Sequence, residues 1–297
     1  MPKDNPFQNM VVQFAQLLQQ GKALPEPRPP FPERPVLAAN APRCLIFSPH
    51  PDDEVIIGAL PLRLLRQSGF RVCNVAVTLG SRRDRRRERL EELEAACDYL
   101  GFDLLLPRSQ GFDDINPAGR RGQPRQWRLA VERVVELLEQ QRPTLILMPH
   151  AEDWNQTHIG THLLVQDALE GMPSDFVCHV VETEFWGAMD DPNLLVESTA
   201  EEVADLMAAL SLHRGEVARN PYHLRLMAWM VDNVRRGAEL VGGAGGPAPD
   251  FAFATCYRLS QWRQRRLQRA PGHGRSLARA DEPTLILSLY HDEHEEA

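Results

Sequence analysis

The chain has 297 residues, of which 43% are hydrophobic and 25% charged, a composition typical of a globular protein with a substantial core. Its formal net charge of −8 argues against broad binding to nucleic acid or anionic lipid. No apolar run approaches the roughly 18 residues of a membrane span, and the N-terminal segment lacks the features of a signal peptide. The five cysteines lie far apart, which is typical of buried thiols in a reducing compartment. We therefore expect a cytoplasmic protein without a nucleic-acid partner; the sequence leaves its oligomeric state open.

Two segments precede the main domain. The apolar spacing over Phe7–Leu18 predicts a short amphipathic helix. The next segment, Leu24–Arg43, contains seven prolines, a density that disfavours both helix and sheet and predicts an extended strap. We therefore divide the chain into an N-terminal helix and proline-rich strap, residues 1–43, and one domain over residues 44–297 that includes a C-terminal extension of helices and strands.

From Cys44 onward, predicted strands alternate with predicted helices. This alternation is typical of parallel βαβ units and predicts an α/β fold, Rossmann-like, with a mostly parallel sheet and helices on both faces. The predicted strands are Cys44–Ser48, Val72–Leu79, Asp103–Leu106, Thr144–Met148, Cys178–Thr183, Phe251–Leu259 and an edge strand at Thr284–Tyr290. The predicted helices are Val55–Gln67 with Pro61 as the site of a kink, Arg85–Leu100, Arg128–Gln141, His158–Leu169, Ala200–Arg219 and Tyr222–Leu240. We expect the acidic tail, His291–Ala297, to be mobile.

A histidine and three consecutive acids follow the first predicted strand, in the sequence His50-Pro51-Asp52-Asp53-Glu54. Imidazole and carboxylate are suitable zinc ligands, and open α/β sheets bind their ligands at the carboxyl ends of strands. The spacing of His50 and Asp53 lets both side chains converge on one point, with Asp52 beside them as a general base. The acids also suit the first turn of a helix, but capping does not account for the histidine. The motif therefore predicts a metal site.

A third metal ligand is expected near the end of another strand, Thr144–Met148, where three histidines follow. His158 and His162 are four residues apart and would share one helix face, although the glutamate of an HExxH motif is missing between them. The position of His158 just after the strand end favours it as the ligand. The purpose of His150 stays open.

The residues Pro49 to Glu54 resemble the HPDDE-type motif of the LmbE-like, or PIG-L, family of zinc-dependent N-deacetylases, and the segment from Asp153 to His158 resembles the HxDH-type motif of that family. The resemblance covers about Cys44–Leu169 and implies an LmbE-like fold. It implies that His50, Asp53 and His158 bind zinc. It also implies that Asp52 takes a proton from the attacking water and returns it to the leaving amine.

The second motif departs from the family pattern. Asn155 replaces a histidine that steadies the oxyanion, and Thr157 replaces an acid. An asparagine amide still donates a hydrogen bond, though not as a cation. Asn155 therefore remains the candidate oxyanion donor. The alternatives are that His150 or His162 takes this role, that the rate is lower, or that the chain is an inactive homologue.

Two further candidates come from the resemblance. Asp114 occupies the place of a family acid near the metal; the alternative is a solvated loop acid. Arg89 matches a family arginine that contacts a polar substrate, but it lies in the charged run Arg82–Arg89, much of which must be a solvated helix face. The same run could attract an anionic substrate or partner despite the acidic net charge.

The resemblance implies zinc-dependent removal of the acetyl group from an N-acetyl amino sugar or a related small conjugate. Two alternatives stay open, namely a metal-dependent hydrolase of a non-sugar amide and a noncatalytic metal- or ligand-binding homologue. The nitrogen and oxygen ligand set also accepts other divalent metals. His213, Glu216 and the segment Asn220-Pro221-Tyr222-His223 are candidates for the wall of the pocket, although periodicity favours structural helix for most of them. The aromatic residues Trp154, Phe185 and Trp186 either shape a sugar-sized cavity or pack in the core.

Overall fold

A single sheet organises the chain. The computed structural model describes residues 5–269 and 274–288, and within these ranges it contains nine strands. They are β1 (Arg43–Ser48), β2 (Arg71–Ala76), β3 (Asp103–Leu105), β4 (Leu145–Pro149), β5 (Cys178–Thr183), β6 (Leu194–Ser198), β7 (Phe253–Arg263), β8 (Arg266–Arg269) and β9 (Arg275–Leu277). The order is β3-β2-β1-β4-β5-β7-β6-β9, with β8 paired to β7. Strands β1 to β5 are parallel to their neighbours among themselves, and β7 is antiparallel to β5, β6 and β8.

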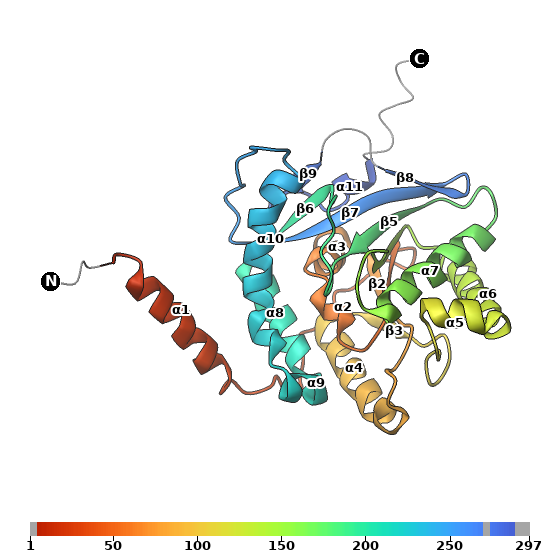
Figure 1. Ribbon diagram of the computed structural model, residues 1–297, viewed down its shortest axis with the longest axis horizontal. Coiled ribbons are helices and arrows are strands. Elements are labelled where there is room, and N and C mark those ends of the chain that lie inside the picture. The colour runs from red at the N-terminus through yellow and green to blue at the C-terminus, as the bar shows by residue number, and fades with distance from the viewer. Residues whose placement is uncertain (1–4, 270–273, 289–297) are drawn as a thin grey trace, which may run out of the picture.

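Helices connect the strands and cover both faces of this sheet (Figure 1). The described helices are α1 (Gln8–Gly21), α2 (Asp53–Ile56), α3 (Leu60–Ser68), α4 (Arg86–Leu100), α5 (Pro117–Gly122), α6 (Pro124–Gln141), α7 (Gln156–Gly171), α8 (Ala200–Ser211), α9 (Arg214–Arg219), α10 (Leu226–Leu240) and α11 (Leu285–Ser288), with 3₁₀ turns η1 (Arg83–Arg85) and η2 (Tyr222–Arg225). The architecture confirms the predicted α/β fold with a mostly parallel sheet.

Both faces of the central strands are apolar, which is why their sequences are nearly continuous hydrophobic runs. In β1, Cys44 and Ile46 pack into a core that includes α3, α4 and α8, whereas Leu45 and Phe47 pack against α6 and α7 on the other face. Strand β4 alternates in the same way. Successive side chains of a strand point to opposite faces, so one strand anchors both layers of helices.

The sheet reverses its winding between β1 and β4. The chain passes from β1 to β2 and β3 on one side, and β4 then pairs with β1 on the other side. The carboxyl ends of two such strands open a crevice where α/β proteins bind ligands. The segments that begin at Pro49 and at His150 both leave the sheet at this point.

The N-terminal helix α1 projects from the body in Figure 1, and each of its residues is exposed or half-buried. Its presence confirms the helix predicted over Phe7–Leu18. Among the described residues, no helix combines the length and apolar character that crossing a membrane requires. The five cysteines are buried free thiols, as predicted.

The predicted helix Val55–Gln67 is wrong in its continuity, because α2 and α3 are separate helices. The break falls at Gly58, with φ +87°, and not at Pro61, which lies in the first turn of α3, where a proline is tolerated. A Cβ at Gly58 would lie 2.2 Å from Thr255 Oγ1, so the tight turn against β7 requires glycine.

Two C-terminal predictions also need correction. The helix predicted over Ala200–Arg219 is interrupted at His213, whose backbone is not helical and whose side chain turns inward. The edge strand predicted at Thr284–Tyr290 is wrong for the described residues, where Leu285–Ser288 forms a helical turn and β9 takes the edge of the sheet. The predicted tail, His291–Ala297, lies outside the described residues.

A fully buried arginine fixes the C-terminal extension to the core. Arg63 on α3 donates hydrogen bonds to the backbone oxygens of Glu197, Ala278 and Asp281, at 3.1, 2.9 and 2.8 Å. These carbonyls lie in segments far along the chain, so one side chain holds β6 and the turn after β9 against α3.

Replacing Arg63 should therefore destabilise the fold. A buried carbonyl left without a donor costs about 1–3 kcal/mol, so we expect Arg63→Leu to lower the free energy of unfolding by about 3–5 kcal/mol in urea denaturation. The control is Arg66→Leu on the same helix, which removes a partly exposed pair with Asp205 and should cost at most about 1 kcal/mol. Equal effects of the two substitutions would contradict this role.

Candidate metal centre

Two strand ends bring the three predicted ligands together. His50 follows β1 directly, Asp53 is the first residue of α2, and His158 lies in the first turn of α7, after β4. Because β1 and β4 are neighbours, residues 108 positions apart in the sequence meet above the sheet. His158 and Asp53 are buried, and His50 is half-buried toward the cavity.

The three ligand atoms form a triangle of equal sides. His50 Nδ1, Asp53 Oδ2 and His158 Nε2 are each 3.3 Å from the other two. Ligands bound at about 2.0–2.1 Å to a tetrahedral zinc ion lie roughly 3.3 Å from one another. The residues therefore fit zinc in spacing and in chemistry, with two imidazole nitrogens and one carboxylate, and two of them, His50 and Asp53, line the cavity.

Contacts around the triangle hold each ligand in place. Asp53 Oδ2 accepts the backbone N–H of His50 at 2.9 Å, and His158 Nδ1 lies 3.5 Å from Asp153 Oδ2. Asp153 also accepts the backbone N–H of Asn155 at 2.7 Å. Phe185 packs edge-on against the His158 ring, with centroids 4.6 Å apart. A carboxylate behind a ligand histidine fixes the orientation of the ring, a role that sequence spacing did not assign to Asp153.

The charges in the site shift the pKa values of its ligands. Burial alone would lower the pKa of His158, but the carboxylates of Asp53 and Asp153 raise the pKa of His158 to about 9. Against the effect of burial, His158 and His50 hold the pKa of Asp53 well below its usual range. Without a metal ion, a proton on His158 thus compensates the buried carboxylate.

Asp52 lies beside the triangle in a strained backbone conformation. Its φ is +109°, a left-handed value that non-glycine residues adopt only when their surroundings enforce it. Two contacts do so: the backbone N–H of Asp52 donates to Glu54 Oε2 at 2.9 Å, and the hydroxyl of Tyr222 donates to Asp52 Oδ2 at 2.7 Å. Burial and the neighbouring Asp53 raise the pKa of Asp52 to about 7.

The C-terminal extension reaches this site through His213. Its Nε2 lies 2.8 Å from Glu54 Oε1, and both side chains are completely buried. Glu54 thus links His213 to the backbone of Asp52. The carboxylate of Glu54 raises the pKa of His213 above its usual range, against the effect of burial. The sequence left His213 between pocket wall and structural helix, and in the structure it supports Asp52 through Glu54.

A cavity of about 940 Å³ opens over the triangle, and the remaining predicted site residues line it. Asn155 caps α7, since its Oδ1 accepts the backbone N–H of Thr157 at 2.9 Å. Asp114, at φ +55°, is exposed and accepts a hydrogen bond from Gln123 at 3.0 Å, outside the ligand triangle. Arg89 donates to the backbone oxygen of Pro51 at 2.8 Å and lies 3.6 Å from Asp52 Oδ2.

The other two histidines that follow β4 point into the protein. His150 is fully buried, with Nε2 2.9 Å from the backbone oxygen of Gly187, and His162 Nδ1 lies 3.0 Å from the backbone oxygen of Pro149. Neither is among the residues that line the cavity. These two histidines therefore hold the loop after β4 and do not replace Asn155 as donors to a substrate.

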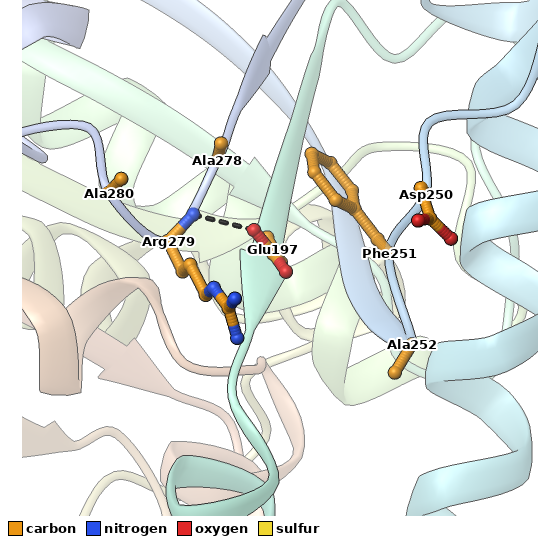
Figure 2. A pocket seen from close by; sticks show the side chains of 7 residues that line it. All are labelled: Glu197, Asp250, Phe251, Ala252, Ala278, Arg279 and Ala280. Atoms are coloured by element: carbon orange, nitrogen blue, oxygen red, sulfur yellow. Dashed lines mark hydrogen bonds between the residues drawn. The ribbon is translucent and has the colours of Figure 1, made fainter.

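A second hollow, of about 440 Å³, lies near the C-terminal strands (Figure 2). Its carboxylate Glu197 accepts the backbone N–H of Arg279 at 2.6 Å, which closes the turn after β9. Asp250 and Phe251 belong to the loop before β7. No residue of the ligand triangle lines this hollow, so the candidate metal centre belongs to the larger cavity.

Comparison with known proteins identifies the segment that carries the triangle. A family model described as PIG-L: GlcNAc-PI de-N-acetylase matches residues 45–169. Over this segment the chain is similar to the PIG-L, or LmbE-like, family. No curated protein sequence matches the chain.

Solved structures share the fold of this chain. N,N'-diacetylchitobiose deacetylase from Pyrococcus horikoshii is 14% identical, with a TM-score of 0.53 over 87% of this chain and 94% of its own. Teicoplanin deacetylase Orf2, in a zinc-inhibited form, is 16% identical, with a TM-score of 0.52 over 74% and 98%. GalB, the 4-carboxy-2-hydroxymuconate hydratase of Pseudomonas putida KT2440, is also 16% identical, with a TM-score of 0.52 over 73% and 95%. At such identities the likeness shows the fold, which deacetylases and a hydratase have in common.

The PIG-L segment does not contain the whole site. It includes the three ligands, Asp52 and Asn155, whereas His213 and Tyr222 lie beyond residue 169. From the sequence, Tyr222 is a candidate for the wall of the pocket at the start of a predicted helix, and it does line the cavity. A tyrosine has no motif spacing that would reveal a contact with a residue 170 positions away.

The raised pKa of His158 makes zinc binding depend on pH. Below about pH 9 zinc must displace the proton of His158, so from about pH 6 to pH 8 the apparent affinity should rise roughly tenfold per pH unit. Competition with a chelator of known proton affinity measures this slope. An affinity that stays constant over this range would contradict the charge compensation described for His158.

Proposed function

We propose that the protein is a zinc-dependent hydrolase that removes the acetyl group from an N-acetyl amino sugar or a related small conjugate. The observation that carries the proposal is the triangle of His50, Asp53 and His158, with sides of 3.3 Å and Asp52 beside it. A zinc ion held there would supply a Lewis acid and favour ionisation of water near neutral pH. The other components of the reaction come from the chain itself.

Asp52 is the proposed general base. Its side-chain contacts with Tyr222 and Arg89 both use Oδ2, so we assign the proton transfer to Oδ1. A pKa of about 7 suits a group that takes a proton from the attacking water and returns it to the leaving amine. The enforced backbone conformation of Asp52 keeps its carboxylate aimed at the cavity.

Three further residues are proposed to contact the substrate. Because Oδ1 of Asn155 is occupied in capping α7, its amide N–H₂ is the group available to donate to the developing oxyanion. Asp114 and Arg89 line the same cavity, and we assign them to polar groups of the substrate. Their positions support this role but place neither of them in the ligand triangle.

Aromatic side chains support a sugar-sized substrate. Trp154, Trp186 and Tyr222 line the cavity, with Trp186 centred 6.1 Å from Trp154 and 6.4 Å from Tyr222. Trp154 and Trp186 are exposed. Aromatic rings combine an apolar face with a polar edge and suit the surface of a sugar ring. The cavity volume is in the range of small-molecule sites.

Two substitutions separate metal binding from proton transfer. His158→Ala should lose zinc, as measured by metal analysis, and all activity. Asp52→Asn should keep zinc but release acetate from an N-acetyl sugar roughly 10²–10⁴-fold more slowly, the usual contribution of a general acid–base. Undiminished acetate release by the zinc-loaded Asp52→Asn protein would contradict the assignment of the base.

A panel of N-acetyl amino sugars and non-sugar N-acetyl amides tests the reaction itself. Acetate released from the sugars supports the proposed function, and release from the other amides alone would favour the broader amidohydrolase. Because a hydratase has the same fold, the assay must identify acetate as the product and not only follow loss of the substrate. Zinc bound in the expected site with no acetate released from any compound would leave a noncatalytic metal-binding protein.

The contact between Tyr222 and Asp52 has its own test. Tyr222→Phe removes a hydrogen bond that stabilises the ionised carboxylate, so it should raise the pKa of Asp52 and lower kcat roughly tenfold. The acidic limb of the rate–pH profile should then move to higher pH. Tyr99→Phe, which removes a hydrogen bond to Asp205 away from the cavity, is the control and should leave the profile unchanged. An unchanged profile in Tyr222→Phe would sink the proposed contact.

A further inference from the structure

The charge of the cavity is opposite to that of the chain. The whole chain has 41 acidic and 33 basic residues. Among the residues that the structure describes, however, six arginines and five carboxylates line the cavity. One of these carboxylates, Asp53, would be neutralised by a bound metal ion. The arginines are Arg82, Arg83, Arg85, Arg86, Arg89 and Arg219. Basic groups thus gather at one place on an acidic protein.

The carboxylates near these arginines are shared. Glu216 lies within ion-pair distance of Arg85, Arg89 and Arg219. Asp113 pairs with both Arg83 and Arg86. Arg82 also pairs with Asp84, Arg85 with Glu88 and Arg89 with Asp52. Five carboxylates thus face six guanidinium groups, and a small excess of positive charge remains along this side of the cavity.

Three of the arginines are accessible to a ligand. The side chains of Arg82, Arg83 and Arg219 are 70%, 79% and 73% exposed, whereas Arg86 and Arg89 are largely buried and bind backbone oxygens. Exposed ion pairs contribute little to stability, so these three side chains can exchange a protein carboxylate for an anion of the ligand. Guanidinium groups match carboxylate and phosphate in geometry and bind them in a bidentate manner.

We propose that the substrate carries an anionic group, a phosphate or a carboxylate, which Arg82, Arg83 and Arg219 bind at the mouth of the cavity. This inference rests on the proposed function, because it names the class of N-acetyl conjugate that the site accepts. Arg82 and Arg83 come from the start of η1 and Arg219 from the end of α9, so two separate elements converge on the anion. The acetamide would lie at the metal centre and the aromatic rings beside the sugar.

The test compares neutral and anionic substrates with the zinc-loaded full chain. N-acetylglucosamine is the neutral compound, its 1-phosphate and 6-phosphate provide phosphate, and N-acetylmuramic acid provides carboxylate. We expect kcat/KM to be at least about tenfold higher for one or more of the anionic compounds, since a charged hydrogen-bonded pair typically contributes that much. This preference should decline as salt concentration rises.

Variants assign the preference to the proposed residues. The triple substitution Arg82→Ala, Arg83→Ala and Arg219→Ala should reduce the ratio of anionic to neutral kcat/KM at least about tenfold, to near one. Arg87→Ala is the matched control, because Arg87 is 92% exposed on the same charged run, pairs with Glu91 and does not line the cavity. The control should keep the preference. A preference that survives the triple substitution, or that Arg87→Ala also removes, would overturn the assignment.

The assays distinguish a wrong substrate class from a wrong reaction. Acetate released from neutral and anionic sugars at equal rates would overturn the anionic substrate and leave the deacetylase intact. If no compound yields acetate, the affinity for the same sugar phosphates still decides the inference. This affinity can be measured from the change in tryptophan fluorescence on binding, since Trp154 and Trp186 line the cavity. Binding that is tighter for the phosphates than for N-acetylglucosamine and weakened by the triple substitution would support it, and equal binding would overturn it.

Discussion

The site depends on the close approach of two imidazole nitrogens and one buried carboxylate, each 3.3 Å from the others. Such an arrangement is stable only when a positive charge lies among the three atoms, either a metal ion or a proton on His158. The fold provides the approach, because β1 and β4 are neighbours and their carboxyl ends open toward the same crevice. The packing on both faces of these strands keeps the two histidines in register.

The C-terminal extension contributes to the same centre. Asp52 adopts a left-handed backbone conformation that its own sequence does not favour. Glu54 accepts the backbone N–H of Asp52, and His213 contacts Glu54 in turn. The hydroxyl of Tyr222 donates to the carboxylate of Asp52. Since His213 and Tyr222 lie outside the segment matched by the family model, the described extension is part of the support of the site as well as an addition to the sheet.

Charge is distributed unevenly over the protein, and the distribution bears on function. Because acids are in excess overall, we expect no general affinity for nucleic acid. The sequence places arginines in one run, but it does not show which of them are solvated. Tertiary structure divides the run: Arg86 and Arg89 turn inward to backbone oxygens, Arg87 points to solvent, and Arg82 and Arg83 line the cavity.

The sequence by itself determined the α/β alternation, the end of β1 as a ligand-rich turn, and the identity of His50, Asp53 and His158 as a set. These features depend on local periodicity and on short motifs, which the chain carries within a few residues. Only the tertiary structure decided that α2 ends before Gly58, that His150 and His162 face inward, and that Tyr222 contacts Asp52 across 170 positions. Those contacts depend on which segments pack together, and neither periodicity nor motif spacing encodes a partner that lies on another element.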